Sequence, residues 1–189
     1  MKEFARCGFA GTSAESIAEA AGFSGGAFYS NYRSKQSILV DVMRTLQAEE
    51  SEAWQRIISE GRSVEEIVEQ LAERGERFAR QEDWLLLKLE LELRAARNEE
   101  FRQEYAAYRT ELRQLARAML DSLYRRAGGR TPGNVEVLVD SWLAFSTGIG
   151  LYYLGEQQAT LRETVRKTVV IPFFLSLLAQ AEPASSSPP

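Results

Sequence analysis

One short segment near the start of the chain constrains the fold more than any other. Residues 12–35 contain two apolar patterns of helical spacing, and Gly22 lies between them. Glycine readily adopts the left-handed backbone conformation that a tight turn between two helices requires. Hydroxyl residues precede both patterns, at Thr12, Ser13 and Ser24, and such residues cap helix N-termini. The segment therefore predicts a helix-turn-helix, whose second helix lies in the major groove of DNA.

The same spacing predicts which surface of the motif reads DNA. Thr12 and Glu15 have the spacing of a capping box, so the first helix is expected to begin at about Ser13. The exposed face of the second helix is expected to comprise Gly25, Gly26, Ala27 and Ser30, with Tyr29 and Asn31 beside them. Thr12, Ser24 and Lys35 stand where backbone amides or a cation can meet phosphates. Any one of these residues alone is an ordinary cap or loop residue, and only the whole string indicates DNA binding.

That string resembles the tetracycline-repressor (TetR) family of transcriptional regulators. The residues in register with the family pattern are Phe4, Gly8, Phe9, Thr12, Ser13, Ile17, Ala18, Ala21, Gly22, Ser24, Gly26, Phe28, Tyr29, Tyr32, Ser34 and Lys35. The resemblance implies phosphate contacts for Thr12, Tyr29 and Lys35, and base contacts for the small residues of the second helix. The DNA-binding residues predicted in this way are Thr12, Ser13, Ser24, Gly25, Gly26, Ala27, Tyr29, Ser30, Asn31, Tyr32 and Lys35.

The segment departs from the family pattern in two ways. Asn31 stands where the family usually has His, although an Asn side chain can still donate a hydrogen bond to a phosphate. The family also has a longer helix before the Gly8-Phe9 pair, whereas only residues 1–7 precede it here. Most of the helix that braces the motif is therefore expected to be missing, and a helix as short as the remainder is marginal by itself.

The rest of the chain has helical periodicity, so the expected fold class is all-α. Apolar stripes predict helices over residues 35–59, 63–81, 99–127 and 160–180, with another opened by Thr131-Pro132. Between residues 84 and 94 leucines alternate with charges as in a strand, but Leu, Glu and Lys favour a helix, for which Asp83 would be the cap. Pro172 is expected to kink or cut the last helix.

These patterns predict three segments along the chain. Residues 1–47 are expected to form a helix-turn-helix DNA-binding domain, truncated at its N-terminus. Residues 48–181 are expected to form a helical domain for regulation and dimerisation, and residues 182–189, rich in Ser and Pro, a disordered tail.

Composition narrows the function. The 189 residues include no histidine and a single cysteine, Cys7, so we expect neither an enzyme nor a metal or cofactor site. No signal peptide is visible, and no apolar run approaches the ~20 residues of a membrane span, which favours the cytoplasm. Residues 1–47 carry five basic and four acidic side chains, whereas the remainder carries eighteen basic and twenty-three acidic ones. DNA is therefore tolerated at one end of the chain and repelled by the rest.

Two further surfaces are predicted in the helical body. Small residues among apolar ones in the last two long helices favour a homodimer that completes a four-helix bundle, although packing within the chain fits the pattern equally well. The predicted interface comprises Leu143, Gly148, Leu151, Val165, Val169, Phe173 and Leu177. The predicted ligand pocket comprises Phe78, Trp84, Glu90, Tyr105, Tyr108, Trp142 and Phe145. Because most of its walls would be aromatic, the expected effector is a small apolar molecule.

The leading interpretation is a ligand-responsive transcriptional regulator, namely a dimeric repressor that leaves a palindromic operator in double-stranded DNA when its effector binds. The alternative is a dimeric helical small-molecule-binding protein that has lost DNA binding together with its first helix. A gel shift with promoter DNA separates the two.

Overall fold

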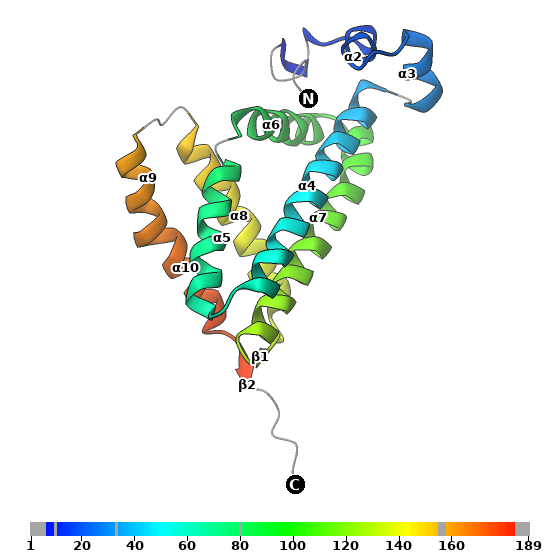
Figure 1. Ribbon diagram of the computed structural model, residues 1–189. Helices are drawn as coiled ribbons and strands as arrows, with labels where there is room; N and C mark the ends of the chain where they lie inside the picture. Colours follow the sequence, from blue (N-terminus) through cyan, green and yellow to red (C-terminus); the bar gives the residue numbers. More distant parts are fainter. Residues whose placement is uncertain (1–6, 10, 33, 80, 155–157, 184–189) are drawn as a thin grey trace. The chain divides into compact units, whose positions relative to one another are not determined.

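The computed structural model describes residues 7–9, 11–32, 34–79, 81–154 and 158–183, and almost all of them are helical (Figure 1). The α-helices are α2 (Ala14–Ala20), α3 (Gly25–Asn31), α4 (Lys35–Glu60), α5 (Val64–Ala79), α6 (Glu82–Arg97), α7 (Glu99–Arg126), α8 (Val135–Tyr153), α9 (Ala159–Val165) and α10 (Ile171–Leu178). A π-helical turn, η1 (Arg166–Val170), joins α9 to α10, and two short strands, β1 (Gly129–Arg130) and β2 (Glu182–Pro183), pair antiparallel. The expected all-α class is confirmed.

Helices α2, α4, α5 and α7 begin after a hydroxyl or amide side chain that caps them, and two helix starts differ from the sequence prediction. The cap of α2 is Ser13, whose hydroxyl accepts a hydrogen bond from the amide of Ser16. In return, the Ser16 hydroxyl accepts a hydrogen bond from the amide of Ser13. The capping box predicted for Thr12 and Glu15 is therefore wrong by one residue, and the Thr12 hydroxyl instead donates to the carbonyl of Gly8. Asp83 does not cap α6 either, since the helix begins one residue earlier, at Glu82.

The segment with alternating leucines is a helix, as its composition predicted. Leu87 and Leu91 are buried one turn apart, whereas Leu93 is exposed, so burial follows the helical repeat of the segment and not its alternation. Leu, Glu and Lys are strong helix formers, and the only strands in the described part of the chain are β1 and β2.

Pro172 disturbs the last helix by adding a residue to one turn. The amide of Ile171 donates to the carbonyl of Arg166, five residues back, which defines the π-helical turn η1. Proline has no amide hydrogen, so the ladder must be rearranged around it. The helical path continues into α10, and the predicted disruption at Pro172 takes this form. Within the segment predicted as a tail, Glu182 pairs with Arg130 in the short ladder; residues 184–189 lie outside the described part.

The chain divides into two compact units, which are described separately. The first unit comprises Met1–Ala48 and Gln81–Glu111, and the second comprises Glu49–Arg80 and Leu112–Pro189. The division cuts through α4 and α7, so the first unit holds α6 and the start of α7 as well as the helix-turn-helix. The domain boundaries expected near residues 47 and 181 stay a prediction.

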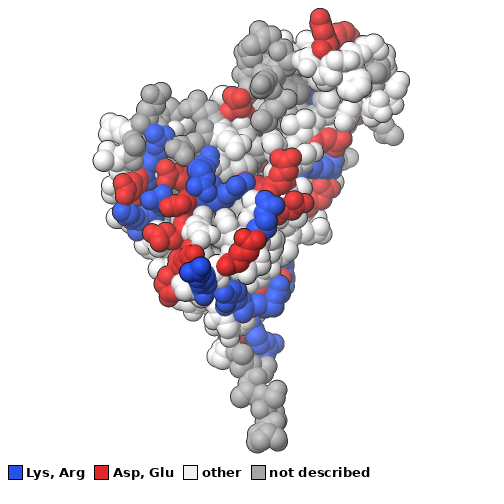
Figure 2. Space-filling view, in the orientation of Figure 1, with Lys and Arg blue, Asp and Glu red and all other residues white. Residues whose placement is uncertain are grey.

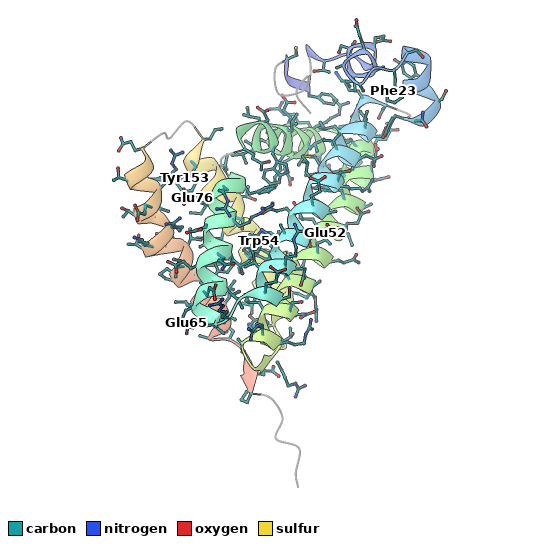
Figure 3. All side chains as sticks on the ribbon, in the orientation of Figure 1. Phe23, Glu52, Trp54, Glu65, Glu76 and Tyr153 are labelled. Carbon is teal, nitrogen blue, oxygen red and sulfur yellow. The ribbon has the colours of Figure 1, made fainter. Side chains whose placement is uncertain are left out.

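The second unit is built on a continuous apolar core. Trp54 contacts Trp142 and Phe174, with ring centroids 5.1 and 5.9 Å apart, and α5 packs against both α8 and α10. At the turn between α4 and α5, a Cβ on Gly61 would collide with Ile67, so only glycine fits there. Figure 3 shows Trp54 pointing from α4 into this core.

Acidic and basic side chains alternate along the visible face of the second unit (Figure 2). Several charged side chains of this unit are paired, for example Arg113 with Asp140 at 2.8 Å, at exposed positions where a pair contributes little stability. None of the helices in the described ranges is sufficiently long and apolar to pass through a bilayer.

Candidate DNA-binding interface

The turn between α2 and α3 has the geometry that the sequence predicted. Gly22 has a φ of +76°, in the left-handed region, and the amide of Phe23 closes the turn on the carbonyl of Ala18 at 2.8 Å. A Cβ on Gly22 would meet nothing within 4 Å, so glycine is required there by backbone conformation and not by space. The turn ties α3 to the end of α2, and the Tyr29 hydroxyl adds a long contact to Glu15 at 3.4 Å.

The predicted DNA-facing residues of α3 are exposed where the structure describes them. Gly26, Ser30 and Asn31 are open to solvent, and Tyr29 is 61% exposed. The Ser30 hydroxyl donates to the carbonyl of Gly26 at 3.0 Å, which lets a serine sit on a helix surface without an unsatisfied donor. The structure does not describe the exposure of Gly25, Ala27 and Phe28. The roles in DNA contact stay predictions.

Phe23 is a candidate contact that sequence reasoning missed. It follows the turn glycine directly, and its side chain is 67% exposed, the largest exposure among the large apolar residues described. Figure 3 shows it at the turn between α2 and α3. The signal available in the sequence was a large aromatic residue directly after the turn glycine. A ring at this position could contact the methyl group of a thymine.

Two residues predicted to contact phosphate are engaged within the protein. The Lys35 ammonium donates to the carbonyls of Phe9 and Thr12 at 2.5 and 2.6 Å and lies 4.2 Å from the centre of the Phe9 ring. Burial lowers the pKa of Lys35, and the nearby Arg94 lowers it further while Glu90 opposes the shift. Thr12 is buried, and its hydroxyl donates to the carbonyl of Gly8 at 2.7 Å. Lys35 therefore stabilises the start of the helix-turn-helix domain, which is called the head below. Its DNA contact remains a prediction.

Helix α6 also holds the start of the head, which the sequence did not predict. The amide of Phe9 donates to the Glu90 carboxylate at 2.6 Å. The Arg94 guanidinium lies 4.9 Å from the centre of the Phe9 ring and 5.6 Å from that of Phe101, so it is sandwiched between two aromatic faces. Glu90, expected in the ligand pocket, is thus a contact between α6 and the head. Phe9 is held by cations beside its ring, a carboxylate on its amide and Lys35 on its carbonyl.

The predicted pocket residues fall in different units. Trp84, Tyr105 and Tyr108 are buried in the first unit, where the Tyr105 and Tyr108 rings stack with centroids 5.3 Å apart. Phe78, Trp142 and Phe145 belong to the second unit, where Phe145 stacks on Phe173 at 4.0 Å. A void beside Trp142 measures about 10 Å³, room for one water at most. Trp142 and Phe145 are therefore packing residues of the second unit.

The predicted dimer residues differ in exposure. Leu151 and Val169 are exposed, and a Cβ on Gly148 would meet nothing within 4 Å. Leu143, Val165 and Phe173 are half-buried. Leu177 is only 4% exposed, and its carbonyl accepts the Tyr124 hydroxyl at 2.9 Å, so its side chain belongs to the core of its own chain.

Comparison with known proteins addresses the head alone. Residues 1–42 match the model of the N-terminal domain described as "Bacterial regulatory proteins, tetR family", which confirms the resemblance. No curated protein and no solved structure matches the chain significantly. Residues 1–42 are thus a tetR-family helix-turn-helix domain, and the chain is a DNA-binding transcriptional regulator. Regulators of this family are transcription factors and not enzymes.

Proposed function

We propose that this chain, which carries the DNA-binding domain of the tetR family, is a dimeric repressor released from a palindromic operator by a small, mostly apolar effector. It would act in the cytoplasm, where bacterial DNA lies. The observation that carries the proposal is the attachment of the head to α6, through the Phe9 amide on Glu90 and the Phe9 ring against Arg94. The head therefore shares one packed unit with a helix that the sequence assigns to the regulatory body.

This attachment supplies a physical route from effector to DNA. A ligand releases DNA only by binding the DNA-incompetent arrangement more tightly than the competent one. A tenfold shift in operator affinity needs about 1.4 kcal/mol of such differential binding. Losing the charge-assisted hydrogen bond between the Phe9 amide and the Glu90 carboxylate would change the free energy of attaching the head to α6 by an amount of this size. A movement of α6 that breaks this hydrogen bond would therefore be sufficient to shift the balance between the DNA-competent and DNA-incompetent arrangements of the head.

Exposed residues on the C-terminal helices support a dimer. On α8, Val137, Ser141, Ala144, Gly148 and Leu151 are exposed at spacings of three and four residues, which puts them on one stripe. Val169, Pro172 and Leu175 continue an exposed apolar surface along η1 and α10. A stripe of small and apolar side chains suits close packing of helices from two subunits. Two heads in such a dimer would meet successive major grooves about 34–36 Å apart.

The test selects binding sites from random double-stranded DNA with the purified chain. We expect a palindrome whose half-sites lie one helical turn apart, and transcription from a promoter carrying it should rise when the chain is absent. The variant Gly148→Glu should be monomeric by light scattering and should lose the palindrome, because a charge in a packed helix interface is costly. A second variant, Glu111→Gln, lies outside the stripe and serves as the control.

Three outcomes would contradict the proposal. Enrichment of a single half-site by the unmodified chain would remove the dimer, and a fall in transcription when the chain is absent would make it an activator. Binding of small molecules without any DNA selection would favour the alternative of a ligand-binding protein that no longer binds DNA.

A further inference from the structure

The turn between α2 and α3 presents one aromatic ring among small residues. Phe23 is 67% exposed, although its side chain is entirely apolar. Its described neighbours on either side are also exposed and have small side chains or none: Ala21, Gly22, Ser24 and Gly26. Within residues 21–24 and 26, the ring is therefore the largest group that is open to a partner.

This ring lies beside the element that enters DNA. In a helix-turn-helix, the N-terminal residues of the second helix contact base edges in the major groove. Phe23 stands two residues before Gly25, the first residue of α3, and its amide donates to the carbonyl of Ala18 at 2.8 Å, which fixes its backbone at the turn. Because residues 1–42 are a tetR-family domain of this kind, the ring lies at the end of α3 that meets the bases.

Charge and size around the ring favour DNA over a protein partner. No acidic residue stands between Glu19 and Asp41, whereas Arg33 and Lys35 in the same segment are basic. The segment therefore carries no negative charge that would repel the phosphates of a nearby duplex. A single ring among small side chains is also far smaller than the apolar patch that marks a protein interface.

The chemistry of the side chain restricts which base it can recognise. A phenyl ring has no hydrogen-bonding atom, so it cannot read the donors and acceptors of a base edge. The apolar feature that the major groove presents is the C5-methyl group of thymine, which Phe side chains contact. Tyr29 is also exposed but has a polar end, since its hydroxyl contacts Glu15 at 3.4 Å.

We propose that Phe23 is a specificity-determining residue, whose ring packs on the C5-methyl group of a thymine in the DNA site. The inference depends on DNA binding by the tetR-family domain and is independent of the proposed dimer and effector. It assigns recognition to a methyl group and not to the whole base. Since 5-methylcytosine carries the same methyl group at the same position, the ring should also favour 5-methylcytosine over cytosine.

The test measures the contribution of the methyl group with and without the ring. Binding sites are selected from random double-stranded DNA, and each thymine of the preferred site is then replaced by deoxyuridine, which lacks only the methyl group. At one thymine position, we expect the unmodified chain to bind about fourfold more weakly by fluorescence anisotropy, the effect of one buried methyl group. At the same position, 5-methylcytosine should bind about fourfold more tightly than cytosine. Both differences should disappear in Phe23→Ala.

Two further variants separate the ring contact from general effects of truncation. Phe23→Leu keeps an apolar side chain and should keep part of the preference for thymine over deoxyuridine. Leu93→Ala removes another exposed apolar side chain, on α6, and should leave the preference as it is in the unmodified chain. None of these substitutions removes a charge, so the salt dependence of DNA affinity should be the same in all of them. Urea unfolding checks that each variant is folded.

Three results would overturn the inference. The first is a preferred site that contains no fixed thymine. The second is a thymine preference in Phe23→Ala equal to that of the unmodified chain, which would show that the ring only supports the turn. The third is a changed association state of Phe23→Ala by light scattering with its methyl preference intact, which would make the ring a protein contact. Selection of a single half-site would contradict the proposed dimer and leave this inference standing.

Discussion

The interiors of the two units pair their buried tyrosine hydroxyls differently, although each unit also holds a buried arginine Nε, that of Arg94 and that of Arg166, without a hydrogen-bond partner among the described residues. In the second unit, the buried Glu50 carboxylate accepts the Trp54 indole at 2.7 Å and also binds Arg74. The Tyr124 hydroxyl there is equally buried and donates to the carbonyl of Leu177. In the first unit, the Tyr108 hydroxyl has no such partner among the described residues.

The two units therefore differ in how completely their buried tyrosine hydroxyls are paired. A core in which buried polar groups are paired and the largest side chains are aromatic resists rearrangement. A buried donor without an acceptor, such as the Tyr108 hydroxyl, costs stability instead. Helix α6 contributes Lys88 to the interior of the first unit and also makes the contacts with Phe9.

The largest effect should come from opening the aromatic core of the second unit. Leu120→Ala removes a buried side chain that borders the small void beside Trp142, so it enlarges an existing cavity. We expect a loss of about 3 kcal/mol in the free energy of unfolding, measured by urea denaturation. Gln114→Ala, at an exposed position on the same helix, should change it by less than about 0.5 kcal/mol. Similar losses for both would mean that this core is not close-packed.

A smaller loss should follow from breaking the buried polar network of the same unit. Arg74→Met leaves the Glu50 carboxylate with the Trp54 indole as its remaining partner from this network. An incompletely compensated buried carboxylate should lower the free energy of unfolding by about 2 kcal/mol. Arg77→Met, three residues along α5 and paired with Glu73 at the surface, is the control and should be nearly neutral. An equal effect of the two would place Glu50 in contact with solvent.

Replacing Lys88, which is buried in the first unit, should change stability with the opposite sign. Burial holds the pKa of Lys88 below its ordinary value of 10.5, so the folded chain binds fewer protons than the unfolded chain between the lowered value and 10.5. Stability contributed by this group therefore rises with pH across that window, and at neutral pH the buried charge is a cost. Lys88→Met should accordingly raise the free energy of unfolding at pH 7, by a gain that shrinks as the pH approaches 10.5. A loss at pH 7 would show that the ammonium stabilises the fold.

Local signals predicted the helices well, because their causes lie within a few residues. Gly22 marked the turn, and the composition of residues 84–94 outweighed their strand-like alternation. The cap of α2 was misplaced because Thr12 and Ser13 are chemically similar neighbours, and the choice depended on Ser16. The π-helical turn could be anticipated from Pro172 only as a disruption, since its form depends on how the surrounding turns adjust.

The roles of individual polar side chains depended on contacts far apart in the sequence. Glu90 was expected in a pocket and instead accepts the amide of Phe9, eighty-one residues away. Lys35 had the position of a phosphate contact, yet carbonyls of the folded head engage it. Tyr108 was assigned to a pocket for its aromatic ring, whereas its unmatched hydroxyl is the informative feature. Periodicity indicates that such residues face inward and gives no information about which groups they meet.

The comparison between the units is tested most directly by removing one hydroxyl from each. Tyr124→Phe and Tyr108→Phe delete the same atom from two tyrosines that are each 1% exposed. In the absence of any ligand, we expect Tyr124→Phe to lower the free energy of unfolding by about 1 kcal/mol, because the Leu177 carbonyl loses its donor. Tyr108→Phe should leave it unchanged or raise it, because no hydrogen bond is lost. Equal losses for the two variants would show that the Tyr108 hydroxyl is satisfied, and would contradict the contrast drawn here between the two buried hydroxyls.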